Sequence, residues 1–266
     1  MKTAMAGFLV ACVFCAFSGV ADAKMRVRDV QWQLEGRTYQ GALVYDDAST
    51  SRRPGLLMIP NWYGVTSGAL AKAKRIAGRD YVILVGDMYG KGRRPADTAQ
   101  ARSAVRPLYG DRAEMRKRVS KALQVLRAQA SSAPIDRKRL AAIGFCFGGS
   151  AVLDLARSGA DIAAVVSFHG GLSTGDPTLA KNIRAHVLVM NGADDKGTMG
   201  EADAFMDEMR GSPADWQFVV LGHAVHCFTE TDEHAPGCRY DARAARRSYR
   251  LMAHWLDDAF AGADGR

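Results

Sequence analysis

The stretch Gly144-Phe145-Cys146-Phe147-Gly148-Gly149 predicts a sharp turn between a strand and a helix. It follows the short apolar run 140–143 and precedes segment 150–157, whose composition favours a helix. Glycines around Cys146 leave room where strand and helix close on each other, and the turn forces the central residue into a strained conformation. The turn lifts the Cys146 sulfur to the positive end of the helix, where a thiolate is favoured. Cys146 is therefore a candidate nucleophile, and the Phe147 N–H is a candidate donor to a developing oxyanion.

Short apolar runs alternate with segments of helical period along the rest of the chain. Two alternating runs, 26–34 and 38–45, predict a hairpin around residues 35–37. The other expected strands are 55–60, 81–85, 140–145, 163–168, 186–190 and 216–221, and the expected helices are 68–77, 113–129, 150–157, 200–210 and 242–260. Strands that alternate with helices favour an α/β fold with a mostly parallel central sheet and helices on both faces. No linker composition divides this part of the chain, so we expect one domain.

Four polar groups follow predicted strands at their carboxyl ends, where ligands bind in such sheets. These residues are Asn61, Cys146, Asp195 and His226. A cysteine nucleophile needs a histidine that exchanges its proton and a carboxylate that orients this histidine. Cys146, Asp195 and His226 follow one another in that order, each after a different strand. Asp194 is an alternative carboxylate and His223 an alternative base, and a buried cysteine without chemistry is the other interpretation of the turn.

With these motifs the chain resembles the dienelactone hydrolase family, which has the α/β-hydrolase fold, over essentially all of residues 24–266. Further stretches lie where the family's motifs fall: 60–64, 86–90, 167–171, 192–195 and 226–228. The resemblance implies a hydrolase of small esters or lactones in which Cys146 is the nucleophile, Asp195 the acid and His226 the base. It also implies that the backbone N–H groups of Trp62 and Phe147 form the oxyanion hole. We expect no cofactor.

The chain departs from the family pattern at three positions. Many relatives have a glutamate that takes part in activating the cysteine where this chain has Asn61. Two arginines that hold the substrate carboxylate in the lactone-cleaving members align with Lys91 and Glu230, and a lysine does not replace a bidentate arginine. Asn61, Tyr63 and Lys91 are thus candidate pocket residues, and the expected substrate is an ester or lactone other than dienelactone. The alternative is a catalytically weak or silent protein that binds a small molecule or a metal on the same fold.

Residues 1–23 have the pattern of a secretory signal peptide. Lys2 provides a positive charge, residues 5–20 are almost wholly apolar, and Ala21-Asp22-Ala23 is a suitable cleavage site. A lipoprotein signal ending at Cys12 is disfavoured because the apolar run continues well past that cysteine. The mature chain is therefore expected to begin near Lys24, in a periplasm or outside the cell.

Cys146, Cys227 and Cys238 remain after such cleavage, and an odd number in an oxidising compartment suggests one pair and one free thiol. Cys227 and Cys238 are candidates for a disulfide that closes the loop around Pro236-Gly237. Two separate thiols are the alternative, because the sequence does not give the separation of the Cα atoms. Neighbouring histidines and these cysteines are metal-ligand types, but their spacing matches no compact motif, so we expect no metal site.

The formal net charge of the 266 residues is +8. Basic residues are denser at 91–94, 112–118 and 243–250, but no long basic run contains interleaved aromatic residues, which argues against nucleic-acid binding. The basic group at 91–94 either belongs to a solvated surface or favours anionic substrates at the mouth of the site. The expected partner is a small ester or lactone, with no nucleic acid and, after signal cleavage, no membrane; the oligomeric state is not predicted.

Overall fold

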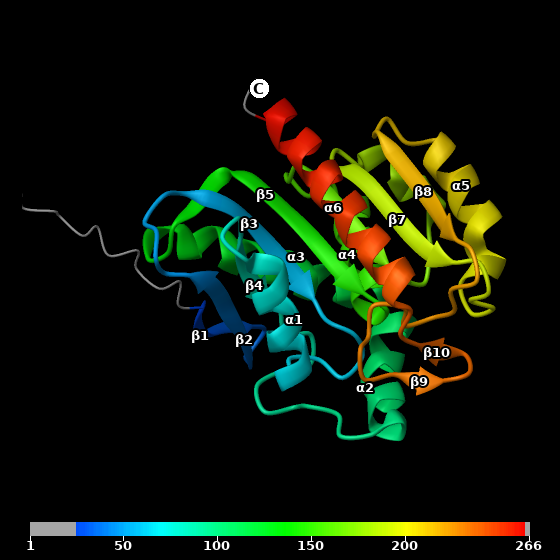
Figure 1. Ribbon diagram of the computed structural model, residues 1–266, viewed down its shortest axis with the longest axis horizontal. Coiled ribbons are helices and arrows are strands. Elements are labelled where there is room, and N and C mark those ends of the chain that lie inside the picture. Colours follow the sequence, from blue (N-terminus) through cyan, green and yellow to red (C-terminus); the bar gives the residue numbers. More distant parts are fainter. Residues whose placement is uncertain (1–24, 264–266) are drawn as a thin grey trace, which may run out of the picture.

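The computed structural model describes residues 25–263, in which one eight-stranded sheet forms the centre of the molecule (Figure 1). In sheet order the strands are β1 (Met25–Leu34), β2 (Arg37–Asp46), β4 (Val82–Val85), β3 (Arg53–Ile59), β5 (Ile135–Phe145), β6 (Ala164–Phe168), β7 (His186–Gly192) and β8 (Trp216–Leu221). Strands β3 to β8 are parallel, whereas the β1–β2 hairpin joins them antiparallel through β4. The mostly parallel sheet is therefore confirmed, while the predicted signal peptide lies outside the described residues.

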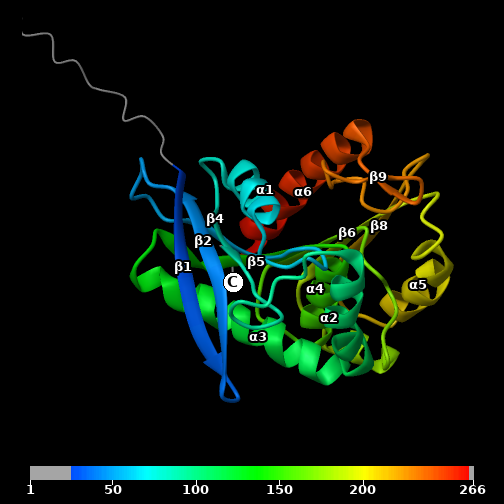
Figure 2. The same cartoon turned by 90° about the horizontal axis from the view of Figure 1, so that it is seen from below.

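Helices cover both faces of the sheet (Figure 2). One face carries α1 (Ser67–Ala77) and α6 (Ala242–Ala263), and the other carries α2 (Thr98–Gly110), α3 (Arg112–Ala128), α4 (Phe147–Arg157) and α5 (Ala202–Arg210). The smaller elements are the 3-10 helices η1 (Gln129–Ser131), η2 (Pro177–Asn182) and η3 (Met199–Glu201) and the short strands β9 (His234–Ala235) and β10 (Cys238–Arg239). Within residues 25–263, no helix combines the length and the apolar character needed to cross a membrane.

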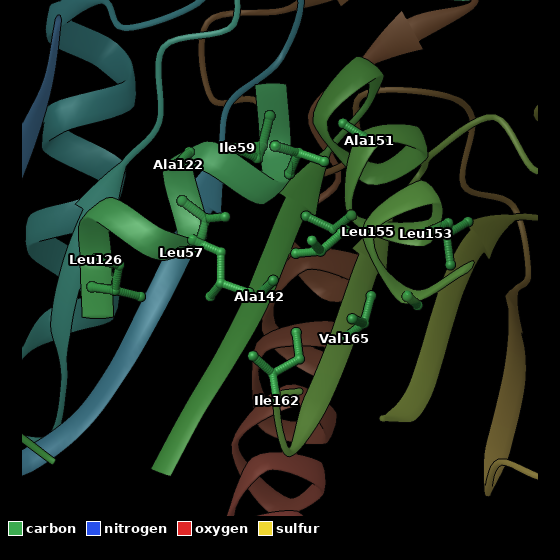
Figure 3. Close-up of a cluster of buried hydrophobic side chains, with 14 of the residues drawn as sticks. Leu57, Ile59, Ala122, Leu126, Ala142, Ala151, Leu153, Leu155, Ile162 and Val165 are labelled. Atoms are coloured by element: carbon green, nitrogen blue, oxygen red, sulfur yellow. The ribbon is translucent and has the colours of Figure 1, made fainter. Parts of the chain in front are cut away.

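Two layers of buried apolar side chains form the core, one on each face of the sheet. Along β3, Leu57 and Ile59 belong to the layer under α3 and α4, whereas Leu56 and Met58 belong to the layer under α1 and α6. Because both faces of β3 are covered, its sequence from Leu56 to Ile59 is a continuous apolar run and not an alternation of apolar and polar residues. Figure 3 shows part of the first layer, in which strand residues Leu57, Ala142 and Val165 lie with the helix residues Ala122, Leu126, Ala151 and Leu155.

Helix α2 was not predicted from the sequence. Its buried positions are few, namely Ala101, Val105 and Leu108, and Pro107 stands inside it. Asp97 caps the helix by accepting a hydrogen bond from the Gln100 N–H at 2.8 Å. Pro107 has no N–H to donate to the carbonyl four residues earlier, so the helix lacks one hydrogen bond there. Capping and docking therefore stabilise a helix that has a weak apolar pattern.

The order of the strands reverses between β3 and β5. Strand β4 lies on one side of β3, and β5 to β8 extend from the other side. In open parallel sheets, such a reversal leaves a crevice at the carboxyl ends of the strands, where ligands bind. The chain leaves β3 at Pro60 and leaves β5 at Cys146, so the fold places the segment after Pro60 beside the candidate nucleophile.

Candidate active site

The turn at Cys146 has the strained geometry that the sequence predicts. Cys146 has φ 54° and ψ −117° and immediately precedes α4. A Cβ on Gly144 would lie 2.0 Å from the Gly148 carbonyl oxygen, and one on Gly148 would lie 2.0 Å from the Ile59 carbonyl oxygen. Only glycine fits at these two positions, since β3, β5 and α4 approach one another through their backbones.

The structure brings Cys146, His226 and Asp195 into one row of contacts. His226 Nε2 lies 3.1 Å from Cys146 Sγ, and His226 Nδ1 lies 2.7 Å from Asp195 Oδ2. The Thr198 hydroxyl donates to Asp195 Oδ2 at 2.7 Å, and the Gly197 N–H donates to Oδ1 at 3.0 Å. Thr198 and Gly197 thus hold the Asp195 carboxylate in position against His226, and this carboxylate orients the His226 ring toward the Cys146 sulfur.

The two alternative residues take no part in this row. Asp194 is exposed, and its backbone N–H donates to the Ala224 carbonyl at 2.9 Å. His223 is also exposed and occupies a turn position with φ 64°. The geometry therefore favours Asp195 over Asp194 and His226 over His223 as partners of the sulfur.

The contacts set the charge of the histidine. Burial disfavours the protonated ring, but the hydrogen bonds to Asp195 and Cys146 outweigh burial and raise the pKa of His226 to about 10. Burial acts on Asp195 in the direction of a higher pKa, but the hydrogen bonds from His226, Thr198 and Gly197 hold that pKa below its ordinary value. At neutral pH the row therefore contains an imidazolium between the carboxylate and the sulfur.

Two backbone N–H groups are candidate donors to an oxyanion, because Trp62 lines the same cavity as Cys146 and Phe147 follows Cys146 in the chain. Within the described part of the chain, neither the Trp62 N–H nor the Phe147 N–H has a hydrogen-bond acceptor. Phe147 is the first residue of α4, where N–H groups have no acceptor in the helix itself. The Tyr89 hydroxyl donates to the Trp62 carbonyl at 2.9 Å, and the Tyr89 ring stacks on Phe147 with 5.9 Å between centroids. Tyr89 thereby ties together the two segments that carry the donors.

A cavity of about 1040 Å³ opens over Cys146 and His226. Its apolar wall is formed by Trp62, Val105, Tyr109 and Val225, and its charged lining residues include Arg102, Asp194, Lys196, Glu201 and Glu233. Its size suits a small organic molecule. Val105, Tyr109 and Arg102 come from α2, the unpredicted helix, so the sequence reasoning missed this wall.

The predicted pocket residues are placed differently from one another. Asn61 lines the large cavity, whereas Tyr63 lines only a neighbouring cavity of about 170 Å³. Lys91 lines neither cavity, which corrects the expectation that it contacts the substrate. Its N–H donates to the Thr38 carbonyl at 2.8 Å, and its ammonium lies 3.3 Å from Gln31 Oε1. Both contacts join the segment after β4 to the β1–β2 hairpin. Lys91 therefore packs against the hairpin and not against the cavity.

Two of the departures from the family pattern contact each other. The Asn61 amide donates to Glu230 Oε2 at 2.8 Å, and Lys72 forms a buried ion pair with Glu230 Oε1. The Lys72 ammonium also lies 4.0 Å above the centre of the Phe145 ring. A glutamate at position 61 would face the Glu230 carboxylate, so Asn61 and Glu230 form a matched pair. This contact could not be predicted from the sequence, because it joins residues far apart in the chain.

A disulfide joins Cys227 to Cys238, with 4.9 Å between their Cα atoms, as expected from the odd number of cysteines. It follows His226 directly, and the His226 carbonyl accepts a hydrogen bond from the Arg239 N–H at 3.1 Å. Two neighbouring contacts therefore join residues 226–227, which include the histidine, to residues 238–239. In residues 25–263, no group of three or more histidine, cysteine, aspartate or glutamate side chains could hold a metal ion.

A family model described as "Dienelactone hydrolase family" matches residues 40–260. One similar solved structure is a dienelactone hydrolase-like promiscuous phosphotriesterase from metagenomic libraries, with 37% identity and a TM-score of 0.82 over 90% of this chain and 99% of that one. A Caenorhabditis elegans protein, "Uncharacterized protein K02A2.1", is 38% identical over 48% of this chain and 84% of its own length. A "Putative carboxymethylenebutenolidase" from Yersinia pestis is 24% identical over 79% of this chain and 80% of its own.

Proposed function

The chain belongs to the dienelactone hydrolase family and is a hydrolase of ester or lactone bonds, and we propose that it cleaves its substrate through an acyl-enzyme on Cys146. The observation that carries this proposal is the row of contacts from Cys146 Sγ through His226 to Asp195, which faces the large cavity. A thiolate beside an imidazolium is the state from which a cysteine attacks a carbonyl carbon.

In the first half of the reaction, the Cys146 thiolate attacks the carbonyl carbon of the ester and forms a tetrahedral oxyanion. The N–H groups of Trp62 and Phe147 bind this oxyanion, since both are free of other acceptors in the described chain. The imidazolium of His226 gives its proton to the departing alkoxide as the carbon–oxygen bond breaks. The products of this half are the alcohol and a thioester on Cys146, with a neutral His226.

In the second half, a water molecule attacks the thioester carbon. Neutral His226 removes a proton from this water, and Asp195 stabilises the imidazolium that forms. Collapse of the second tetrahedral intermediate breaks the carbon–sulfur bond. The carboxylic acid leaves, and the thiolate–imidazolium pair is restored.

We propose a neutral substrate with an apolar group, and not dienelactone itself. Among the described residues that line the cavity, Arg102 is a single arginine and Lys91 is absent, so no pair of arginines is present to clamp a carboxylate. Glu230 occupies the position of one family arginine while bound to Lys72 and Asn61. The apolar wall of Trp62, Val105, Tyr109 and Val225 offers contact to an acyl or alcohol group instead.

A substrate panel tests this proposal. The purified protein is assayed against neutral esters of increasing acyl length, against lactones with and without a carboxylate, and against phosphotriesters, since one similar protein is described as a phosphotriesterase. We expect hydrolysis of neutral carboxylic esters, much weaker hydrolysis of the carboxylate-bearing lactones, and loss of activity in Cys146→Ala. Equal hydrolysis by Cys146→Ala would overturn the role of the thiolate, and a preference for the anionic lactones would overturn the substrate class.

We also propose that the protein is exported and that residues 1–23 are removed. The disulfide supports this, because such bonds persist in oxidising compartments. Fractionation of expressing cells and N-terminal sequencing of the product test the proposal. Recovery in the periplasm or medium with Lys24 at the N-terminus is expected, and recovery of the full-length chain in the cytosol would contradict it.

A further inference from the structure

A second histidine, His169, lies behind the nucleophile and is fully buried. Its Nδ1 accepts a hydrogen bond from the Cys146 backbone N–H at 3.1 Å, and the same N–H also donates to the Phe168 carbonyl at 3.0 Å. The His169 ring lies edge-on to the ring of His226, with 5.1 Å between centroids. His169 therefore contacts both Cys146 and His226 without lining the cavity.

The geometry fixes the proton on the His169 ring. Because Nδ1 accepts from a backbone N–H, it carries no proton, and a neutral ring then carries its proton on Nε2. Nε2 lies 2.7 Å from Thr229 Oγ1, which accepts this proton's hydrogen bond and donates its own to Glu230 Oε1 at 3.2 Å. Burial and the nearby charges of His226 and Lys72 hold the pKa of His169 well below its ordinary value, so the ring stays neutral.

The far end of this row of hydrogen bonds is anchored by a buried charge pair. Glu230 accepts from Thr229 and Asn61 and is paired with Lys72, whose side chain is also buried. The Glu230 carboxylate accepts from all three of these groups, and an ionised carboxylate has no proton to donate. Each hydrogen bond in the series from Cys146 to Glu230 is therefore donated in the direction of Glu230. The row is thus Cys146 N–H to His169, His169 to Thr229, and Thr229 to Glu230.

We propose that His169 is a positioning residue that acts on the reaction through the backbone of Cys146. The second acceptor on the Cys146 N–H holds this residue in its left-handed conformation, which keeps Sγ against His226. Thr229 and Glu230 hold His169 in the one tautomer that can accept. The neutral ring also fills the space beside His226 without placing a second positive charge next to the imidazolium. This inference rests on the proposed function, since it concerns the nucleophile of that reaction.

Two variants of Thr229 provide the test, because Thr229 contacts His169 and does not line the cavity. Thr229→Val keeps the shape and removes the acceptor of the His169 proton, whereas Thr229→Ser keeps the hydroxyl. We expect Thr229→Val to lower kcat by about tenfold with KM nearly unchanged, and to move the midpoint of Cys146 alkylation to higher pH. Thr229→Ser should restore both quantities. A normal kcat and midpoint in Thr229→Val, or an equal loss in Thr229→Ser, would overturn the proposal.

Long-range ¹H–¹⁵N correlation spectra of the wild-type protein give a test that needs no substrate. The His169 ring, assigned by the signals lost in His169→Gln, should show a neutral ring with the proton on Nε2 at pH 7. A proton on Nδ1, or a charged ring, would overturn the proposal. If the wild-type protein hydrolyses no ester, the proposed function fails, whereas the tautomer and the alkylation midpoint still decide the role of His169.

Discussion

At the scale of single residues, the site depends on a cysteine held in a conformation that most residues avoid. A φ of 54° costs a non-glycine residue about 1–3 kcal/mol and persists only where the surroundings enforce it. Here the backbone N–H of Cys146 donates to the Phe168 carbonyl and to His169, and His226 is the hydrogen-bond partner of the sulfur among residues 25–263. The strained backbone therefore positions the Cys146 sulfur against His226, and the charge on His226 then decides the reactivity of the sulfur.

The protonation of His226 predicts how kcat/KM depends on pH. Its pKa is raised to about 10, so the ring is protonated below that pH and loses its proton as the pH rises through it. If the imidazolium is the acid that serves the leaving group, kcat/KM should stay level from pH 7 to 9 and fall above about pH 10. Initial rates in a series of buffers measure this. An activity that instead rises with the loss of a proton near pH 6.5 would show that the free enzyme needs a neutral histidine.

Alanine variants distinguish the residues in the row from their neighbours. Asp195→Ala and His226→Ala should each lower kcat by about 10³-fold or more, because the imidazolium loses its orienting partner or is itself removed. Asp194→Ala and His223→Ala are matched controls one to three residues away and should change kcat by less than about tenfold. The reverse pattern in a steady-state assay would move the site to the neighbouring residues.

At the scale of elements, four connections meet at the carboxyl edge of the sheet: the segment after β3, the turn between β5 and α4, and the loops after β7 and β8. The sequence predicted where each connection begins, because buried strands read as apolar runs and glycines mark the turn at Cys146. It missed α2, whose few apolar positions and Pro107 hide its helical period. It also misplaced Lys91, because a short-range pattern does not show which way a loop folds against the β1–β2 hairpin.

The close contact between β3 and α4 predicts that Gly148 cannot be replaced. In Gly148→Ala, the new Cβ would lie 2.0 Å from the Ile59 carbonyl oxygen, and backbone must move to relieve it. We expect a loss of more than about 3 kcal/mol in the free energy of unfolding. Gly110→Ala is the control, since no atom lies within 4 Å of its Cβ at the end of α2, and it should change that free energy by at most about 1 kcal/mol. Urea unfolding of both variants checks this, and equal stability would contradict the packing of the turn.

The disulfide predicts a linked change in stability and activity. Replacing both Cys227 and Cys238 with serine opens a loop whose ends have a sequence separation of 11, which in the loop-entropy model lowers the free energy of unfolding by about 2–3 kcal/mol. Because this loop begins directly after His226, kcat should fall as well. Urea unfolding and steady-state rates, compared with the wild-type protein with and without reductant, measure both effects. Full activity and stability in the double variant would show that β8 and α6 alone hold the loop.

At the scale of the whole molecule, the reversal of strand order between β3 and β5 places the site. It opens the crevice in which a donor from the segment after β3 meets the nucleophile after β5, and β7 and β8 supply Asp195 and His226 along the same edge. From the sequence, chain order and strand ends left Asp194 or Asp195 as the acid and His223 or His226 as the base, and only the resemblance to the family favoured Asp195 and His226. The buried pair Lys72–Glu230 and its partner Asn61 were not predictable, because these residues come from three separate elements and meet only in the folded chain.

The most direct test of the acyl-enzyme is to trap it. Protein mixed with a slowly hydrolysed p-nitrophenyl ester is quenched in acid during the first turnover, and its peptides are mapped by mass spectrometry. The account predicts a burst of nitrophenol close to one equivalent per molecule and an acyl group on the peptide that contains Cys146. Turnover without a burst, with Cys146 unmodified and Cys146→Ala as active as the wild-type protein, would contradict it.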